Sequence, residues 1–158
     1  MNTNYAGFWL RFVAVLIDGL LIGVVQFVAI MPLLAIFGIG VASNIENMES
    51  MDEAQAVSMV GSMMAMGLAA QVVFFVIQTL YFSLMESSSK QATIGKMVLG
   101  LKVTDVNGAK LDFVKALIRN LCKIISSFIL CIGYIMAGFT EKKQALHDMI
   151  ASTLVVKK

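Results

Sequence analysis

The sequence predicts an all-α integral membrane protein with two full transmembrane helices and a third apolar segment that is broken, re-entrant or spanning. Two observations support this prediction. Of the 158 residues, 59% are hydrophobic and 14% are charged, whereas a soluble domain carries about 25% charged residues. Several apolar runs are also long enough to cross a hydrocarbon core of about 30 Å. We expect a single membrane domain over residues 1–158, without a soluble extension.

The first helix is expected over residues 8–42, and it carries an acid inside its apolar run. Residues 12–31 include 13 Leu, Ile, Val or Phe, which favour insertion by about 6 kcal/mol against a cost of about 3 kcal/mol for a central carboxylate. Asp18 should therefore enter the hydrocarbon, where a carboxylate needs a partner, a proton or a water-filled cavity. Pro32 can kink or end this helix.

The distribution of charge predicts the orientation of the chain. Residues 43–56 contain four acids and no Lys or Arg, and they precede a second helix expected over residues 57–85. Of the 12 Lys and Arg residues, 11 lie at or after residue 90. By the positive-inside rule, the N-terminus and a basic connector over residues 86–112 are cytoplasmic, and the acidic loop is external.

The connector begins at Glu86 and contains the dipeptide Asn107-Gly108, a strong short-range signal for a hairpin. We therefore expect a short β-hairpin-like element or a tight turn in an otherwise helical chain. Asp112 is expected to cap the next helix at its N-terminus.

The third apolar segment, residues 113–139, is less uniform than the first two. Lys115, Arg119 and Lys123 follow one another at a spacing of four, so they share one helical face. The apolar second half is short for a full crossing. A simple crossing would also place the lysines of the C-terminal segment, residues 140–158, outside the cell. We therefore favour a segment that enters and returns, with three full spans as the alternative.

Arg11 and Asp18 lie seven residues apart on nearly the same face of the first helix. Helical side chains point toward the N-terminus, so Arg11 leans away from Asp18 and a direct pair is not expected. Each group therefore needs a partner from another segment. The candidate partners of Asp18 are Arg119, Lys123, Lys96 and His147, and those of Arg11 are Asp148 and Glu86.

This charge network has two interpretations. In the first, the network only fixes how the helices pack. In the second, Asp18 exchanges a proton or cation in a cavity open to the cytoplasm; burial raises the pKa of a carboxylate and a nearby arginine lowers it, so protonation can follow the state of the cavity. His147 is either a structural residue or a proton relay. No Ser-His-Asp set, paired-carboxylate site or metal cluster is evident, so we expect no enzyme activity, no cofactor and no metal. Cys122 and Cys131 are expected to be free thiols.

The chain resembles the RDD membrane-protein family, which is named for one arginine and two aspartates. Arg11 and Asp18 match the arginine and the first aspartate, and Asp148, in the segment KKQALHDMIASTLVV, matches the second. The stretch SKQATIGKMVLGLKVTDVNGAKLDFVKALIRN also resembles the family, including the positions Thr93, Gly95, Lys96, Gly100, Gly108, Arg119 and Asn120. The resemblance covers roughly residues 5 to 156.

The resemblance implies a multi-pass protein of the bacterial inner membrane. Members of the family are proposed to transport unknown ligands. Some members are reported to exchange sodium for protons, and others to restrain a membrane peptidase. We therefore expect a transporter or exchanger that uses Asp18 with Arg11 and Asp148. Two or three spans are too few to enclose a pathway, so this function requires a homo-oligomer. The alternative is a non-enzymatic adaptor that binds anionic lipid or a partner membrane protein. No nucleic-acid partner is expected.

Overall fold

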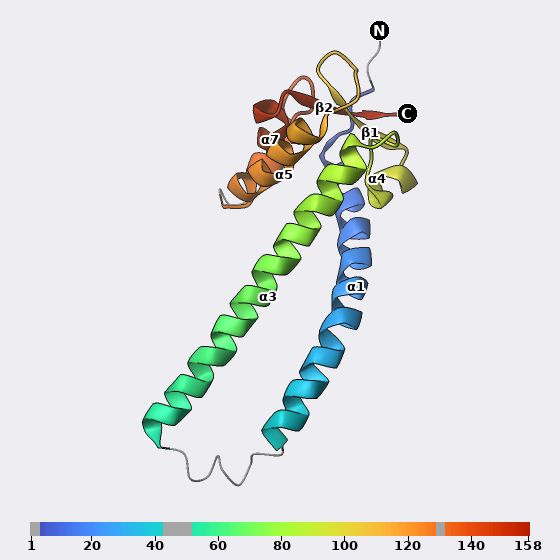
Figure 1. Ribbon diagram of the computed structural model, residues 1–158. Helices are drawn as coiled ribbons and strands as arrows, with labels where there is room; N and C mark the ends of the chain where they lie inside the picture. Colours follow the sequence, from blue (N-terminus) through green and yellow to red (C-terminus); the bar gives the residue numbers. More distant parts are fainter. Residues whose placement is uncertain (1–3, 43–51, 129–131) are drawn as a thin grey trace. The chain divides into compact units, whose positions relative to one another are not determined.

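The computed structural model describes residues 4–42, 52–128 and 132–158, which are mostly helical with one small sheet (Figure 1). The chain divides into two compact units. Unit 1 comprises Met1–Leu20 with Gln78–Lys158, and unit 2 is Leu21–Ile77. All of the charged residues singled out above lie in unit 1, so the fold of this unit decides how they meet.

Two long helices agree with the predicted apolar runs. Helix α1 is Phe8–Ala42 and continues through Pro32, so the proline does not end it. Helix α3 is Glu53–Ser87. By length and composition, Phe8–Pro32 and Glu53–Ser87 could each cross a membrane. The described side chains of unit 2 are mostly exposed, which suits helices whose solvent is lipid.

Helix α3 begins four residues earlier than expected because a polar pair caps it. Asp52 Oδ1 accepts a hydrogen bond from the Gln55 amide at 2.7 Å, and Gln55 Oε1 accepts one from the Asp52 amide at 3.3 Å. This reciprocal arrangement satisfies two amides that the helix leaves unpaired. The end of the predicted acidic loop therefore belongs to the helix, and residues 43–51 lie outside the described residues.

The connector contains helix α4, Ile94–Val98, and strand β1, Leu101–Asp105. Its Asn107-Gly108 dipeptide forms a tight turn, with Gly108 at φ +80° and its amide 2.9 Å from the Asp105 carbonyl oxygen. The prediction of a local hairpin is wrong in the partner strand, because β1 forms no ladder with the residues that directly follow the turn. Strand β1 pairs antiparallel with β2, Thr153–Lys157, from the C-terminus, in a register that sets Val103 opposite Val155.

In the described residues, the third apolar segment contains three helical elements, and residues 129–131 lie outside the described part. Helix α5 is Phe113–Phe128, followed by α6, Ile132–Ile135, and the 3-10 helix η1, Met136–Gly138. Asp112 Oδ1 accepts the Lys115 amide at 2.6 Å, which confirms the predicted N-cap. Helix α7, Leu146–Ile150, then packs against α5.

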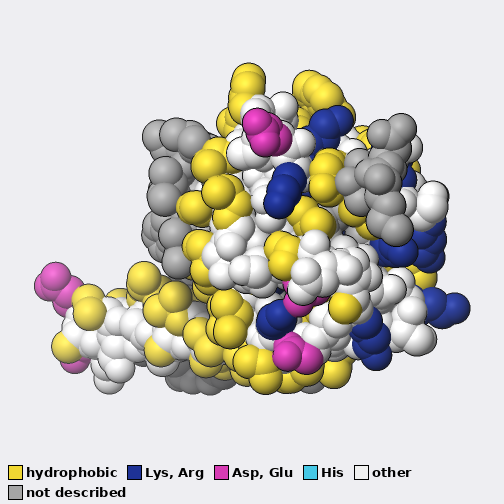
Figure 2. Space-filling view, turned by 90° about the horizontal axis from the view of Figure 1, so that it is seen from above, with side chains coloured by type: hydrophobic (Ala, Val, Ile, Leu, Met, Phe, Trp, Pro, Cys, Tyr) yellow, Lys and Arg dark blue, Asp and Glu magenta, His cyan; other side chains and the backbone are white. Residues whose placement is uncertain are grey.

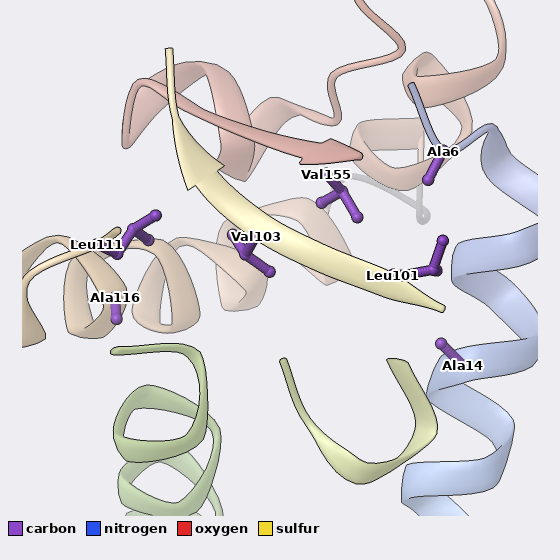
Figure 3. Packing of buried hydrophobic residues seen from close by; sticks show 7 residues of the cluster. All are labelled: Ala6, Ala14, Leu101, Val103, Leu111, Ala116 and Val155. Atoms are coloured by element: carbon purple, nitrogen blue, oxygen red, sulfur yellow. The ribbon is translucent and has the colours of Figure 1, made fainter. Parts of the chain in front are cut away.

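A small apolar core joins the sheet to the helices of unit 1. Figure 3 shows its seven members, which are Ala6, Ala14, Leu101, Val103, Leu111, Ala116 and Val155. The N-terminal segment lies beside β2: Tyr5 forms a bridge with Val156, and the Lys157 amide donates to the Asn4 carbonyl at 2.9 Å. Residues 4 and 5 are therefore fixed along strand β2.

Candidate functional site

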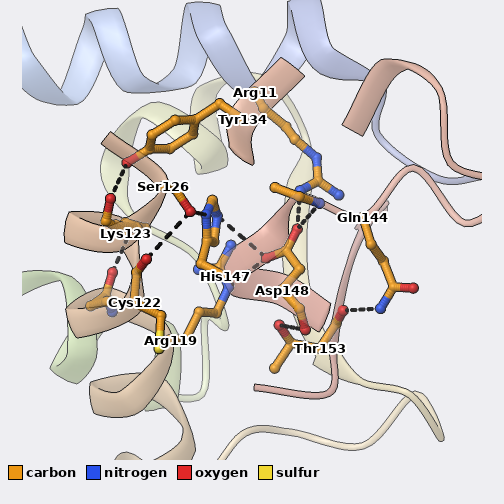
Figure 4. A network of polar contacts seen from close by, with 12 residues as sticks. Arg11, Arg119, Cys122, Lys123, Ser126, Tyr134, Gln144, His147, Asp148 and Thr153 are labelled. Carbon is orange, nitrogen blue, oxygen red and sulfur yellow. Dashed lines mark hydrogen bonds and ion pairs between the residues drawn. The ribbon is translucent and has the colours of Figure 1, made fainter. Parts of the chain in front are cut away.

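The centre of unit 1 is a buried ion network that begins at Asp148 on α7 (Figure 4). Its Oδ1 accepts from Arg119 Nε at 2.8 Å, and its Oδ2 accepts from Arg11 Nη1. The same Oδ2 accepts the Ala145 amide at 3.2 Å, which satisfies one free amide at the start of α7. Asp148 thereby connects α7 to both α1 and α5.

Arg119 links Asp148 to a second buried carboxylate, Glu86 on α3. Its Nη1 donates to Glu86 Oε2 at 2.6 Å. Lys96 on α4 donates to Glu86 Oε1, and Lys123 Nζ lies 3.9 Å from the same oxygen. One guanidinium therefore bridges two carboxylates, and five helices share the network.

Neutral groups complete the hydrogen bonding of this network. Asn120 Nδ2 lies 3.2 Å from Glu86 Oε2 and 2.8 Å from the Ala116 carbonyl oxygen. Arg11 donates Nε to the Ala6 carbonyl at 2.9 Å and Nη2 to the Lys143 carbonyl at 2.6 Å. In the described part of the chain, no buried side-chain nitrogen or oxygen lacks a hydrogen-bond partner. A fully satisfied buried network can fix one arrangement of helices.

The electrostatics of the network favour fixed charges at its centre. Burial opposes the charge of Asp148, but Arg119 and Arg11 outweigh it and hold the pKa of this carboxyl below its usual range. Burial likewise acts against charged Arg119, and Glu86 with Asp148 overcome it and raise the pKa of the guanidinium. These two groups stay ionised at all physiological pH values.

The lysines beside the network behave differently. Burial lowers the pKa of Lys123 to about 7, against the attraction of Glu86, and it also lowers the pKa of Lys96. Lys123 Nζ donates to Asn120 Oδ1 at 2.5 Å and lies 4.6 Å from the centre of the Phe82 ring. Both lysines therefore hold their positive charge less firmly than Arg119 does.

Asp18 has a different environment from the other buried carboxylates. It is 1% exposed, and its oxygens accept hydrogen bonds from Thr93 Oγ1 at 2.5 Å and from the Gly95 amide at 2.7 Å. Both donors are uncharged and come from the start of α4. Among residues 4–42, 52–128 and 132–158, no cation lies within salt-bridge distance of Asp18.

His147 contacts both Ser126 and Asp148, a contact chain that was not expected from the sequence. Ser126 Oγ lies 3.2 Å from His147 Nδ1, and Asp148 Oδ1 lies 3.6 Å from His147 Nε2. The set lacks the features of a hydrolase site. Ser126 is fully buried beneath Gly133, where an added Cβ would lie 2.8 Å from the serine side chain, and Asp148 is already bound by two guanidinium groups.

The environment of His147 keeps its ring neutral. Burial lowers the pKa of His147 to about 3, Asp148 opposes this shift, and Arg119, Lys123 and Arg11 add to it. Its ring lies 5.1 Å from the ring of Tyr134. Because the ring takes up no proton near neutral pH, a structural role for His147 is favoured over a proton relay.

The sequence predicted some partners and missed others. Arg11 contacts Asp148, one of its two predicted partners, and does not pair with Asp18. The predicted cationic partners of Asp18 are wrong: Arg119 and Lys96 instead bind Glu86, Lys123 lies near it, and His147 contacts Ser126. Thr93 and Gly95 hold Asp18, and the only signal for them was their agreement with the family pattern.

No metal centre is evident in the residues that the structure describes, since no three His, Cys, Asp or Glu side chains come together as ligands. Cys122 is a free thiol. Cys131 lies outside the described residues.

Comparisons with known proteins identify relatives of this chain. The chain is 36% identical over 153 residues to the uncharacterized protein YxaI of Bacillus subtilis, covering 97% of both chains. It is 32% identical over 155 residues to the uncharacterized membrane protein YteJ of the same organism, covering 96% of this chain and 80% of the relative. No solved structure gives a significant match. The profile of the RDD family matches residues 5–152, which include Arg11, Asp18 and Asp148, and the chain belongs to the RDD family of membrane proteins.

Proposed function

We propose that the protein exchanges monovalent cations for protons and that the Asp18 carboxylate is the exchanging group. The observation that supports this proposal is the contrast between Asp18 and the other buried carboxylates. Glu86 and Asp148 are each neutralised by two close cationic groups, whereas Asp18, among the residues that the structure describes, receives hydrogen bonds from the neutral donors Thr93 and Gly95. A proton or a small cation can supply the missing positive charge.

The contacts of Asp18 suit this exchange. The Thr93 hydroxyl donates to the carboxylate, and the same oxygen retains lone pairs that can coordinate a cation. Oxygen ligands are those that hard cations prefer. The Gly95 amide keeps the second carboxylate oxygen in a fixed direction. The site therefore holds the side chain in place while the species that neutralises it changes.

Arg11 and Asp148 have a supporting role in this proposal rather than an exchanging one. Their charges are mutually compensated and tied to Arg119. A neutralised pair has little affinity for an added ion, because the new charge would have to displace a guanidinium from a buried carboxylate. The network positions α1, and with it Asp18, against the rest of unit 1.

The proposed assembly and orientation follow from the spans and charges. Two candidate spans per chain cannot surround a pathway, so we propose a homo-oligomer. Exposed lysines occur in the segments that follow α3, and they favour a cytoplasmic N-terminus in a bacterial inner membrane. The mass of the detergent-solubilised particle tests the assembly, and a strict monomer would contradict it.

The exchange itself is tested with purified protein in proteoliposomes that carry an imposed pH gradient. Addition of Na⁺, K⁺ or Li⁺ outside should dissipate the gradient, as reported by a trapped pH dye. Asp18→Asn should abolish this flux and keep the fold. Asp112→Asn, which changes an exposed aspartate outside the network, should retain it. Wild-type vesicles without flux for any of these cations, or a folded Asp18→Asn variant with normal flux, would refute the proposal.

A second candidate, an adaptor that binds anionic lipid, is favoured by the surface of unit 1. Figure 2 shows Lys and Arg side chains on one face of the molecule, beside hydrophobic ones. The exposed lysines of this unit are Lys90, Lys110, Lys142, Lys143, Lys157 and Lys158. Basic clusters attract anionic headgroups. Native mass spectrometry should then show retained phosphatidylglycerol that is lost when Lys142, Lys143, Lys157 and Lys158 are changed to Gln.

A further inference from the structure

Helix α5 turns several apolar side chains outward and most of its polar side chains inward. Apart from Lys115, whose side chain is 43% exposed and pairs with Asp105, the exposed residues in its described part are apolar, namely Phe113, Val114, Ile118 and Leu121. Its buried residues are Ala116, Arg119, Asn120 and Ser126. An amphipathic helix on a water-soluble protein has the opposite arrangement. The solvent that surrounds this helix should therefore be apolar.

Two other short helices of unit 1 show the same inversion. On α7, Met149 and Ile150 are each 48% exposed, while the adjacent His147 and Asp148 are buried. On α4, Val98 is 67% exposed and Lys96 is 5% exposed. Burial of a methylene group in an apolar medium contributes about 0.8 kcal/mol. The pattern therefore favours an apolar neighbour along the outward faces of these helices.

The ion network explains why the polar faces can turn inward. Arg119 on α5 binds Glu86 on α3, and Asp148 on α7 binds Arg11 on α1. Both partner residues lie in helices that are long and apolar enough to span a membrane. Within unit 1, these helices also expose apolar side chains, including Leu16 on α1 and Leu84 on α3. The inward face of α5 therefore contacts α3, a helix that is long and apolar enough to span a membrane, and the outward face is turned away from that contact.

We propose that the outward faces of α5 and α7 lie against the acyl chains of the bilayer that α1 and α3 span. The contact surface consists of Val114, Ile118 and Leu121 on α5 with Met149 and Ile150 on α7. Helix α5 has 16 residues and so rises about 24 Å, which is less than the hydrocarbon thickness of about 30 Å. It enters the membrane sideways, with Arg119 and Lys123 directed at the buried carboxylates Glu86 and Asp148 and with Lys115 paired to Asp105. This proposal does not depend on ion exchange.

Tryptophan fluorescence in vesicles tests the proposal. Trp9 is the only tryptophan of the chain, so Trp9→Phe provides a silent background for Ile118→Trp and Leu121→Trp. Val106→Trp is a matched control, because Val106 is 45% exposed, close to the 43% of Ile118, and lies in the turn after β1. Lipids with brominated acyl chains should quench most of the emission at positions 118 and 121, while aqueous acrylamide quenches little. Position 106 should show the reverse.

Two results would overturn the proposal. Quenching of both α5 positions by acrylamide, as at position 106, would show that the face is in water. Shielding from both quenchers would show that a second copy or another protein covers it. The substituted residues are exposed, so the variants should fold, and each is checked by its thermal unfolding midpoint. Val114→Trp serves as a third reporter if one of the two variants unfolds.

Discussion

Gly95 lies directly against the backbone of α1 at Ala14. A Cβ atom added to Gly95 would be 2.2 Å from the Ala14 carbonyl oxygen and 3.0 Å from Cγ of Asp18. The absence of a side chain is therefore what lets the Gly95 amide reach Asp18 at 2.7 Å. The contact between α4 and α1 depends on this glycine.

We predict that Gly95→Ala destabilises the protein by about 3 kcal/mol or more, because a rigid helix backbone cannot move away from the new methyl group. The thermal unfolding midpoint in detergent measures the change. Gly19→Ala on α1 is the control, since an added Cβ there meets no atom within 4 Å. An unchanged midpoint for Gly95→Ala would contradict the close approach of the two helices.

Removal of the Asp148 charge should be more damaging than removal of the partly buried Asp105 charge, whose lysine partner is exposed to solvent. Asp148→Asn leaves Arg11 and Arg119 without their shared carboxylate, and loss of one partner of a buried ion pair costs about 3–5 kcal/mol. Asp105→Asn, which breaks the outer pair with Lys115 at 2.5 Å, should have little effect. Chemical unfolding of both variants compares the two sites. Equal losses would argue against a central role for Asp148.

The stability of the protein should decrease as the pH falls below about 6.5, because of His147. Its pKa is about 3 in the folded chain and about 6.5 in the unfolded chain, so the unfolded state alone takes up a proton between these values. His147 is the only histidine, and carboxylates ordinarily titrate at about 4.3 or below. Unfolding midpoints between about pH 6.5 and about pH 5 should therefore decline in the wild type and stay nearly level in His147→Gln. A wild type with no decline would contradict a neutral buried ring.

The Thr93 hydroxyl should contribute to holding Asp18. Thr93→Val keeps the shape of the side chain and removes the donor, and loss of a hydrogen bond to a carboxylate costs about 1.5–3 kcal/mol. Thr93→Ser retains the hydroxyl and should lie close to the wild type. Differential scanning calorimetry of the two variants separates the hydroxyl from the methyl group. A similar loss of stability in Thr93→Val and Thr93→Ser would show that packing of the side chain, and not the hydroxyl, is responsible.

The sequence was sufficient for features that depend on local patterns. Apolar runs located α1 and α3, and Asp112 was identified as the cap of α5 from its position before a helical pattern. The direction of helical side chains excluded a pair between Arg11 and Asp18 and left Asp148 as one of two partners for Arg11. Each of these inferences needs only the geometry of one element.

The sequence was insufficient where distant segments meet. Strand β1 pairs with β2 about 50 residues later, and nothing in the alternation of either strand specifies that partner. The expectation of a cation beside Asp18 rested on charge complementarity alone. It failed because a hydroxyl and a backbone amide satisfy the carboxylate, and a backbone amide carries no sequence signal.

The pairing of residues 4 and 5 with strand β2 has a consequence for biosynthesis. Asn4 and Tyr5 meet their partners only when residues 156 and 157 have left the ribosome. Arg11 and Glu86 are synthesised early in translation. Their partners, Asp148 for Arg11 and Arg119 for Glu86, are synthesised later. A nascent chain stalled before α7 would hold its first helix with an arginine that lacks its carboxylate partner, so quality-control proteases should recognise chains truncated before α7.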